Sequence, residues 1–488
     1  MPEKEPLIEK TYYFEGPVSF SSLTAQIFLK FGFVHAPRDH AEVLFSADQG
    51  ERGISAVLSV RDGETFRKES LRNREETGHW LSDILSRMTG EPLGRWGYLT
   101  GMRPGKALYR LFDENGDSWK AAARIFLKER KVSDSIAELL IDTDARQYGL
   151  IAGVKDFEDK RKNISFYIHI PFCPSRCVYC SFPSAVCGRG EVPEEFMHLL
   201  LQDIASSASV ARECGLHAES IYIGGGTPVI LSVSQMDRVL RCIERELSPE
   251  PDCEFTVEAG RPDLMDEETL RLMADSGVGR ISVNPQTMQD RILRAVRRYH
   301  RGTDVEHAVS LARKCGFSVI NMDFIAGLPY QTAADMEENM DAVCNMKPEN
   351  VPIHTLAVKR GSLFRGREKE FSLPGEDEVA AMVRTAHERL RSGGMEPYYL
   401  YRQKYMREDF ANVGYALPGT ECIYNIQMIG ERQTVIGAGP GSVTKAVRGS
   451  SFRLDKFYMP HDIVSYGKNF HELTKKRNRL IRNYFERV

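Results

Sequence analysis

The feature that most constrains the fold is a regular alternation of strand-like and helix-like segments from residue 164 onward. Short runs rich in β-branched, aliphatic and aromatic residues alternate with segments that carry apolar residues at helical spacing. The strand-like runs span residues 164–170, 220–224, 254–259, 280–284, 319–325 and 351–358. The helix-like runs span residues 194–212, 234–246, 267–275, 305–314, 335–346 and 378–390. Six consecutive βα units predict a parallel sheet covered by helices.

The fold class that this alternation favours is α/β. A closed barrel of this kind has eight units, so six units indicate an open, partial (β/α)6 barrel, with a doubly wound sheet as the alternative. We place the barrel at residues 161–395. Before it, residues 1–75 read as a small α/β module and residues 76–160 as a helical linker region. Residues 396–488 read as a short C-terminal extension with irregular strands and a basic terminal helix.

Composition bounds the class of protein. Of the 488 residues, 42% are hydrophobic and 27% are charged, which is typical of a soluble globular chain. The net charge of −3 offers no basic surplus, so we expect no nucleic-acid partner. No run of about eighteen apolar residues predicts a membrane span, and the N-terminus lacks the apolar run of a secretory signal. Ten cysteines without a disulfide-like pattern favour a reducing cytoplasm.

Three cysteines lie close together in the loop that follows the first predicted strand. Cys173, Cys177 and Cys180 have the spacing C-x-x-x-C-x-x-C. Three thiolates in one loop can hold three irons of a 4Fe–4S cluster and leave the fourth iron open to an outside ligand. A zinc site with a distant fourth ligand is the alternative, although zinc motifs usually carry a second C-x2-C pair, which this sequence lacks.

Polar and glycine residues gather where the other predicted strands end, the edge at which parallel barrels carry their chemistry. The residues at these ends are Gly224, Gly225, Gly226, Thr227, Glu258, Gln286 and Asp323. A glycine triplet allows backbone groups to approach a ligand closely, but it also fits an ordinary turn. A strand-end carboxylate also fits a solvated ion pair. No single residue therefore indicates a binding site. Their location together on one rim predicts a binding site there.

The cysteine loop resembles the cluster motif of radical S-adenosylmethionine (SAM) enzymes. The runs YIHIPFC, GGGTP, VEAGRPD, ISVNPQTM, MDFIAGLP and HTLAVKR together resemble the oxygen-independent coproporphyrinogen III dehydrogenase family over residues 164–427. The flanking runs WGYLTGMRP, NVGYALPG and ECIYNIQ resemble its HemZ-type members. The resemblance implies a radical SAM barrel with a 4Fe–4S cluster and SAM as cofactors.

The resemblance also implies roles for individual residues. Cys173, Cys177 and Cys180 would hold the cluster, and Tyr167 would lie near the SAM sulfonium and carboxylate. The other implied SAM contacts are Tyr179 and Ala357 at the adenine, Gly224, Gly225, Gly226 and Thr227 at the amino group, Glu258 and Gln286 at the ribose, Arg298 at the methionyl carboxylate, and Asp323. Gln427 matches a glutamine that contacts a second SAM in the wider family.

The activity implied is oxidative decarboxylation of two propionates of coproporphyrinogen III, which gives protoporphyrinogen IX in anaerobic haem biosynthesis. The implied partners are this tetrapyrrole substrate and an electron donor such as flavodoxin or ferredoxin. Cationic residues should bind the propionates. The candidates are Lys359, Arg360, Arg365, Arg402 and Lys404.

Two departures from the family pattern keep alternatives open. Phe182 stands where the best-known branch has a further cysteine, and the haem-chaperone branch shares this pattern. However, the haem motif of that branch is replaced here by Tyr424, Asn425, Ile426 and Gln427. The alternatives are a haem- or tetrapyrrole-binding carrier and another radical SAM tetrapyrrole enzyme.

Overall fold

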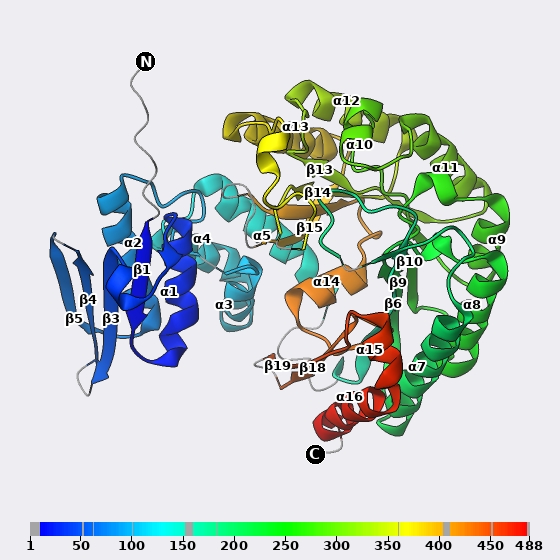
Figure 1. Cartoon of the computed structure of the whole chain (residues 1–488), viewed down its shortest axis with the longest axis horizontal. Helices are drawn as coiled ribbons and strands as arrows, with labels where there is room; N and C mark the ends of the chain where they lie inside the picture. Colours follow the sequence, from blue (N-terminus) through cyan, green and yellow to red (C-terminus); the bar gives the residue numbers. More distant parts are fainter. Residues whose placement is uncertain are drawn as a thin grey trace. The chain divides into compact units, whose positions relative to one another are not determined.

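The computed structural model describes residues 10–50, 53–61, 63–99, 101–151, 160–182, 184–359, 361–403, 410–449 and 452–485. The chain divides into two compact units (Figure 1). The smaller unit comprises Met1–Pro104 and Lys120–Leu139, and the larger unit comprises Gly105–Trp119 and Leu140–Val488. The finer division into four segments, at residues 75, 160 and 395, stays a prediction.

The smaller unit is built on a five-stranded sheet of order β2-β1-β3-β4-β5. Its strands are β1 (Thr11–Glu15), β2 (Val34–His35), β3 (Val43–Gly50), β4 (Gly53–Val60) and β5 (Thr65–Leu71), and its first helices are α1 (Val18–Lys30) and α2 (Arg74–Thr89). The apolar side chains of these elements form a hydrophobic core in which Phe28 stacks on Tyr12 at 4.1 Å. The sequence did not predict β5, whose residues are mostly exposed and polar.

Three further helices follow along the chain. They are α3 (Tyr109–Asn115), α4 (Trp119–Glu129) and α5 (Asp134–Tyr148). They lie where periodicity predicted mostly helical structure.

The larger unit contains the predicted parallel strands within a twelve-stranded sheet. They are β6 (Asn163–Ile170), β9 (His217–Gly225), β10 (Glu254–Val257), β11 (Arg280–Ser282), β12 (Val319–Asn321), β13 (Phe324–Ala326) and β14 (Asn350–Thr355). The predicted fifth strand is split into β12 and β13, with Met322 and Asp323 between them. The prediction of a partial (β/α)6 barrel is thus confirmed, and the doubly wound alternative is not needed.

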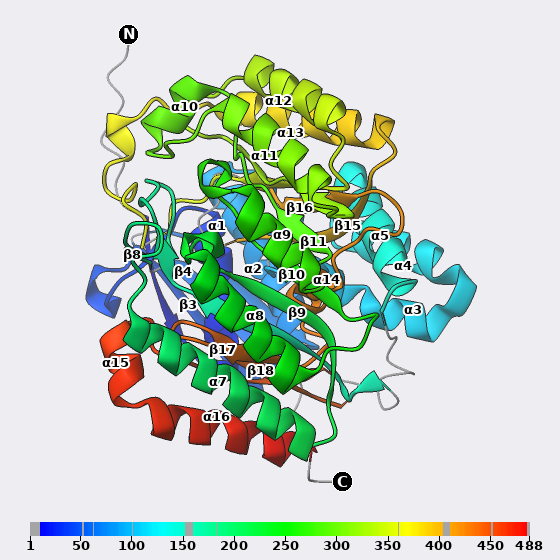
Figure 2. The same ribbon diagram turned by 90° about the vertical axis from the view of Figure 1, so that its right-hand side faces the viewer.

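Helices cover the outer face of this sheet (Figures 1 and 2). They are α7 (Glu194–Glu213), α8 (Val233–Leu247), α9 (Glu267–Asp275), α10 (Asp290–Ala295), α11 (Gly302–Lys314), α12 (Ala333–Met346) and α13 (Glu376–Ser392). Helix α8 shows why they form: Ser232 and Gln235 make a reciprocal capping box at its start. Its residues Met236, Leu240 and Ile243 lie one and two turns apart and are all buried.

The C-terminal residues complete both edges of the sheet. At one edge, β16 (Asn412–Ala416) pairs antiparallel with β14 and with β15 (Glu396–Tyr401). At the other edge, β17 (Val435–Ala438) pairs parallel with β6, and the antiparallel strands β18 (Val443–Arg448) and β19 (Arg453–Tyr458) follow. The sequence did not single out β17, because no βα unit contains it.

The last helices are α14 (Ile423–Gly430), α15 (Ile463–Lys468) and α16 (Phe470–Phe485), and α16 runs beside α7 (Figure 2). A buried ion pair joins the two, because Arg477 of α16 donates to Asp203 of α7 and both side chains are 0% exposed. The same carboxylate accepts hydrogen bonds from the Tyr466 hydroxyl and from the Gly439 amide, at 2.7 and 2.8 Å. Asp203 therefore connects α7, α15, α16 and the residue after β17.

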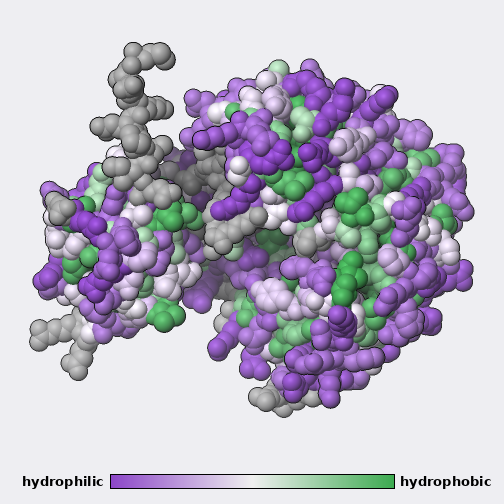
Figure 3. Space-filling model, in the orientation of Figure 1, coloured by the Kyte–Doolittle hydropathy of each residue, from purple (hydrophilic) through white to green (hydrophobic). Residues whose placement is uncertain are grey.

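No helix in the described part of the chain is long and apolar enough to cross a membrane. In the view of Figure 3, the surface of the larger unit is mostly hydrophilic with hydrophobic side chains scattered over it. Scattered exposed apolar residues are normal on globular proteins.

Candidate active site

The carboxyl ends of the parallel strands surround a pocket that encloses about 1270 Å³, including space open to solvent. Most of the residues singled out from the sequence line it. These are Tyr167, Cys173, Cys177, Tyr179, Cys180, Gly225, Gly226, Thr227, Glu258, Gln286, Arg298, Asp323 and Ala357. They come from strands and loops far apart in the sequence, and the common direction of the strands brings them to one rim. We call this space the rim pocket.

The three cysteines lie in a loop that is held on several sides. The short strand β7 (Phe172–Cys173) pairs with β8 (Ala185–Val186), and the Val178 amide donates to the Val296 carbonyl at 3.0 Å. The Thr227 hydroxyl lies 3.5 Å from Cys173 Sγ, so the glycine turn after β9 touches the cysteine loop. Burial raises the pKa of Cys180 to about 11. A bound metal would displace such a proton, since thiolate is the ligating form.

The donor set fits a 4Fe–4S cluster. Each thiolate of such a cluster binds a different iron, and three cysteines from one compact loop supply three of its four protein positions. Among the described residues, no group of three or more His, Cys, Asp or Glu side chains lies close enough together to hold a single metal ion.

Arg298 places a cation beside the cysteines. Its Nη1 lies 3.9 Å from Cys177 Sγ, and its Nη2 donates to the carbonyls of Gly260 and Asn284. Its Nε is buried and has no hydrogen-bond partner in the described structure. A guanidinium with a spare donor at the pocket wall suits a carboxylate ligand.

Three further buried polar atoms of pocket-lining residues lack partners in the described structure, Arg176 Nε, Thr355 Oγ1 and Asn412 Nδ2. Buried polar groups are normally hydrogen-bonded, so such atoms at a pocket wall indicate a polar ligand. SAM carries an amino group, a carboxylate, a ribose and an adenine, and the residues present fit it. Sequence reasoning did not single out Thr355 and Asn412, although both lie within runs that carry the family resemblance.

The glycine turn leaves room that no other residue would leave. A Cβ on Gly225, whose φ is +114°, would lie 2.4 Å from His169 Cδ2. A Cβ on Gly226 would lie 2.3 Å from the Phe172 carbonyl oxygen. Gly224 does not line the pocket: a Cβ there would meet Glu258 Oε2 at 2.9 Å, so this glycine allows Glu258 to pack behind the turn.

Two carboxyl-bearing residues, Glu258 and Asp323, line the rim pocket. Burial, together with the nearby Asp323 charge, raises the pKa of Glu258 to about 8. The Tyr222 hydroxyl and Asn284 Nδ2 each lie 3.4 Å from the Glu258 carboxyl oxygens. Asp323 accepts from Asn321 Nδ2 at 2.7 Å and lies 3.7 Å from His354 Nε2. A protonated Glu258 carboxyl, which this raised pKa favours at neutral pH, can donate a hydrogen bond to a ribose hydroxyl.

Gln286 has a left-handed backbone, with φ at +69°. Its amide donates to the Asp323 carbonyl, and its carbonyl accepts from the Ile325 amide, both at 2.9 Å. These bonds tie the loop after β11 to the segment between β12 and β13. The strained backbone of Gln286 thus directs its side chain to the pocket, and its two hydrogen bonds keep the Asp323 segment beside it.

A second hollow, which we call the tyrosine chamber, extends inside the barrel. It shares Tyr167, Glu258, Asp323, His354 and Tyr401 with the rim pocket. Tyr222, Tyr399 and Tyr424 add further phenol groups to its lining. The Tyr424 ring stacks on that of Tyr222 at 4.5 Å and lies 6.0 Å from that of Tyr167. The chamber is therefore aromatic and is continuous with the rim pocket.

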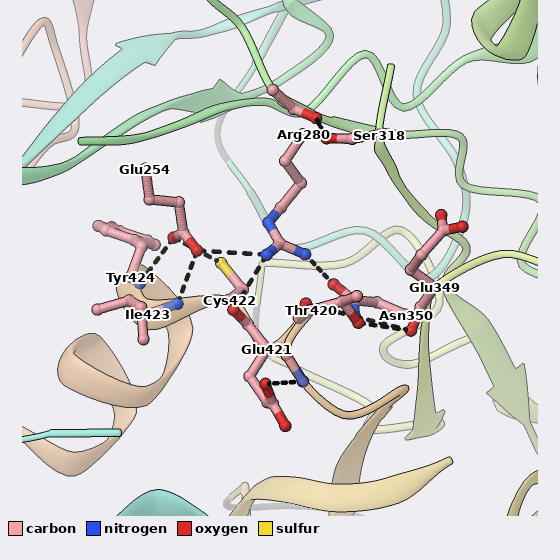
Figure 4. Close-up of polar contacts among 12 residues, drawn as sticks. Glu254, Arg280, Ser318, Glu349, Asn350, Thr420, Glu421, Cys422, Ile423 and Tyr424 are labelled. Carbon is pink, nitrogen blue, oxygen red and sulfur yellow. Dashed lines mark hydrogen bonds and ion pairs between the residues drawn. The ribbon is translucent and has the colours of Figure 1, made fainter. Parts of the chain in front are cut away.

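A buried polar network places Tyr424 there (Figure 4). The Glu254 carboxylate accepts from the amides of Ile423 and Tyr424, at 2.9 and 3.0 Å, at the start of α14. A carboxylate is favourable at a helix N-terminus. Arg280 balances this charge, because its Nη2 donates to Glu254 at 3.3 Å and to the Glu421 carbonyl at 3.0 Å.

Gln427 lies elsewhere. It is on α14, and its Nε2 lies 3.4 Å from Glu219 Oε2, near the amino end of β9. It lines a separate hollow together with Asn163, Glu219 and Gln433. The sequence match could place Gln427 on a segment, but only the helix determines which way its side chain points. The structure therefore does not bring Gln427 to the rim pocket.

Of the candidate propionate-binding residues, Lys359 lines the rim pocket. Arg365 and Arg402 line neither the rim pocket nor the tyrosine chamber. Arg360 and Lys404 lie outside the described residues.

Comparison with known proteins identifies the family. The model of the radical SAM superfamily matches residues 167–343. A Bacillus subtilis (strain 168) protein described as oxygen-independent coproporphyrinogen-III oxidase-like protein HemZ is 34% identical over 399 residues, which cover 81% of this chain and 78% of the relative. The chain belongs to the HemZ-like family of radical SAM proteins. The resemblance stated from its sequence is thereby confirmed.

Other relatives of this HemZ-like chain carry a different description. The heme chaperone HemW of Lactococcus lactis subsp. lactis (strain IL1403) is 32% identical over 291 residues, covering 59% of this chain and 72% of the relative. Among solved structures, coproporphyrinogen III oxidase (HemN) from Escherichia coli matches with a TM-score of 0.52 at 19% identity, over 64% of this chain and 70% of that one. That likeness shows a shared fold. The superfamily implies a 4Fe–4S cluster and SAM as cofactors, and the relatives tie the family to tetrapyrroles.

Proposed function

We propose that this protein decarboxylates propionate side chains of coproporphyrinogen III to give protoporphyrinogen IX. The observation that carries the proposal is that the predicted cluster and SAM residues share one pocket with a half-buried cation, Lys359. A propionate held by that ammonium would lie beside the cofactors. The likeness to the HemZ relative, over 81% of this chain and 78% of that protein, supports the same proposal.

Lys359 suits a carboxylate partner. Burial lowers the pKa of its ammonium, so the free group loses its charge at a lower pH than an exposed lysine. A propionate would compensate for that desolvation by a charge-assisted hydrogen bond. We therefore expect substrate affinity to fall as the pH rises through the depressed pKa of Lys359.

The chain's own residues would bind and orient the reactants. Cys173, Cys177 and Cys180 would hold the cluster, and Arg298, Glu258 and Asp323 would hold the polar groups of SAM. When bound, the cluster and SAM would supply the radical chemistry that removes a β-hydrogen from a propionate. Loss of carbon dioxide, and of one electron to an external one-electron acceptor, would then leave a vinyl group. The protein must also exclude water and oxygen, and the aromatic walls of the tyrosine chamber serve that purpose.

A haem or tetrapyrrole carrier is the second candidate. The observation that favours it is the 32% identity to a HemW heme chaperone over 72% of that relative. A carrier would bind haem in a one-to-one ratio and leave coproporphyrinogen III unchanged.

Anaerobic turnover separates the two functions. The reconstituted protein is incubated with coproporphyrinogen III, SAM and dithionite, and the tetrapyrroles and 5′-deoxyadenosine are separated by chromatography. The expected result is a monovinyl and then a divinyl product, with Lys359→Gln lowering turnover. Recovery of unchanged coproporphyrinogen III, in a mixture where a known decarboxylating enzyme converts it, together with stoichiometric haem binding, would favour the carrier.

A further inference from the structure

A group of exposed cations lies against the cysteine loop, outside the rim pocket. The segment 294–301 begins in the last turn of α10, ends just before α11 and contacts this loop at two points. The Val296 carbonyl accepts from the Val178 amide at 3.0 Å, and the Arg297 carbonyl accepts from the Ser175 hydroxyl at 3.5 Å. Any molecule that docks on this segment is therefore next to the loop that would hold the cluster.

The segment is strongly basic. Arg294, Arg297 and Arg301 are exposed, and the segment contains no Asp or Glu. None of the three forms an ion pair with a carboxylate in the described part of the chain. Arg294 donates from its Nε to the Asp290 carbonyl, and Glu370 lies near enough to Arg297 for the two charges to interact without forming an ion pair. Since the whole chain carries a net charge of −3, this surplus is local and does not reflect composition.

A large aromatic residue lies within the same segment. The Tyr299 side chain is 62% exposed, whereas its neighbours Arg298 and His300 are buried. Arginine and tyrosine are the residue types that most often dominate protein interfaces. We call Arg294, Arg297, Tyr299 and Arg301 the basic patch. None of the four lines the rim pocket or the tyrosine chamber, so binding of cofactor or substrate does not explain them.

The patch connects to the cysteines by a short path that is covalent except for one contact of 3.9 Å. Arg298 lies between Arg297 and Tyr299 in the chain, and its Nη1 is 3.9 Å from Cys177 Sγ. The outer end of this path is at the surface, and the inner end touches a thiol that would hold the cluster. Such a path suits the delivery of electrons from outside.

We propose that the basic patch docks an acidic one-electron carrier protein that reduces the cluster. The step transfers one electron: the carrier is oxidised by one electron and the cluster is reduced by one. Complementary charges steer such encounters and raise their rate by roughly 10- to 1000-fold. The inference rests on the proposed cluster site and goes beyond the proposed function by locating the partner's binding surface.

The test is the rate of cluster reduction by a reduced, acidic flavodoxin, followed in a stopped-flow spectrometer with no tetrapyrrole present. The variant R294E/R297E reverses two charges of the patch. The matched control K475E/R479E reverses two exposed charges on α16, which lies on another part of the larger unit. Dithionite serves as a small reductant that needs no protein interface, and iron content verifies that each variant holds its cluster.

We expect R294E/R297E to be reduced by flavodoxin at least roughly tenfold more slowly than the native protein, with the dithionite rate unchanged. The control variant should behave like the native protein, and the native rate with flavodoxin should fall as salt is added. The milder R294Q/R297Q gives an intermediate rate if charge is the cause. An unchanged flavodoxin rate, an equal loss with dithionite, an equal loss in the control, or a salt-independent native rate would each overturn the proposal. Because no tetrapyrrole takes part, failure of the proposed decarboxylation leaves this result unaffected.

Discussion

At the scale of single residues, the site depends on polar groups that the fold leaves without partners. Arg298 Nε, Thr355 Oγ1 and Asn412 Nδ2 are buried at the rim pocket without hydrogen bonds in the described structure. Each buried donor or acceptor left without a hydrogen bond costs about 1–3 kcal/mol of stability. A polar ligand recovers that free energy, so these residues are organised for binding at the expense of stability.

The cysteine loop gives the first prediction at this scale. Replacing Cys173, Cys177 and Cys180 with Ala removes the thiolates, and we expect loss of bound iron, sulfide and the brown absorbance after anaerobic reconstitution. Cys187→Ala is the control, because Cys187 lies in the next segment of the chain and outside the C-x-x-x-C-x-x-C spacing. Full cluster content in the triple variant would refute the assignment.

Asp323 gives the second prediction at this scale. Asp323→Ala removes an acceptor from the rim pocket, and we expect SAM affinity to fall roughly five- to hundredfold, the equivalent of ~1–3 kcal/mol. The cluster should remain, since Asp323 contacts none of the three cysteines through a hydrogen bond in the described structure. Calorimetric titration with SAM measures the effect, and unchanged affinity would show that Asp323 is not a SAM ligand.

Glu258 gives a pH-dependent prediction for the protein without SAM. Its pKa of about 8 in the folded state lies above its ordinary value of 4.5, so the folded chain holds a proton that the unfolded chain releases between these values. The free energy of unfolding therefore falls as the pH rises through this window, by up to ~1.4 kcal/mol per pH unit. Gln at this position does not titrate, so the free energy of unfolding of Glu258→Gln should fall less between pH 5 and pH 9 than that of the native protein. Parallel denaturation curves at the two pH values would contradict this.

At the scale of elements, two buried ion pairs position the C-terminal helices. Glu254 and Arg280 fix the start of α14, which carries Tyr424 into the tyrosine chamber. Asp203 and Arg477 fix α16 against α7. Removing one partner of such a pair leaves an uncompensated buried charge, which costs more than the pair itself contributes.

Helix α16 therefore offers a matched comparison. Arg477→Met leaves Asp203 buried and unpaired, and we expect a loss of about 3–5 kcal/mol in the free energy of unfolding. Arg482→Met removes an exposed pair with Glu213 on the same two helices and should cost less than about 1 kcal/mol. Denaturant titration of both variants measures the difference, and equal losses would mean that burial of the pair is unimportant.

At the scale of the whole molecule, the two compact units each contain a hydrophobic core of their own. The hydrophobic core of the smaller unit surrounds Tyr12, Phe28 and Phe45. The candidate site lies wholly in the larger unit. A compact unit with a hydrophobic core of its own is expected to respond to a core substitution separately from the other unit.

Phe28→Ala tests this separation. Phe28 is 0% exposed, and its removal leaves a cavity that should destabilise the smaller unit by about 3–5 kcal/mol. We expect the thermal transition of the smaller unit to move to lower temperature, while cluster content and SAM affinity stay unchanged. Loss of SAM binding at a temperature where the larger unit is folded would show that the units are not independent.

The sequence by itself determined the barrel and the chemistry of its rim. Strand and helix periodicities are local properties of the chain, so the six βα units could be read directly, and the carboxyl ends of parallel strands must share one edge. Cys173, Cys177 and Cys180 lie within a few residues of one another, so their spacing alone indicated a shared ligand.

Only the tertiary structure decided which side chains meet across long separations. It placed β17 beside β6, put Thr355 and Asn412 at the rim pocket, and turned Gln427 toward Glu219 instead. The direction of a helical side chain depends on how the helix packs, and here the half-buried Glu254 holds the start of α14. The raised pKa of Glu258 likewise requires burial and a neighbouring Asp323, and neither can be read from a chain in which the two lie far apart.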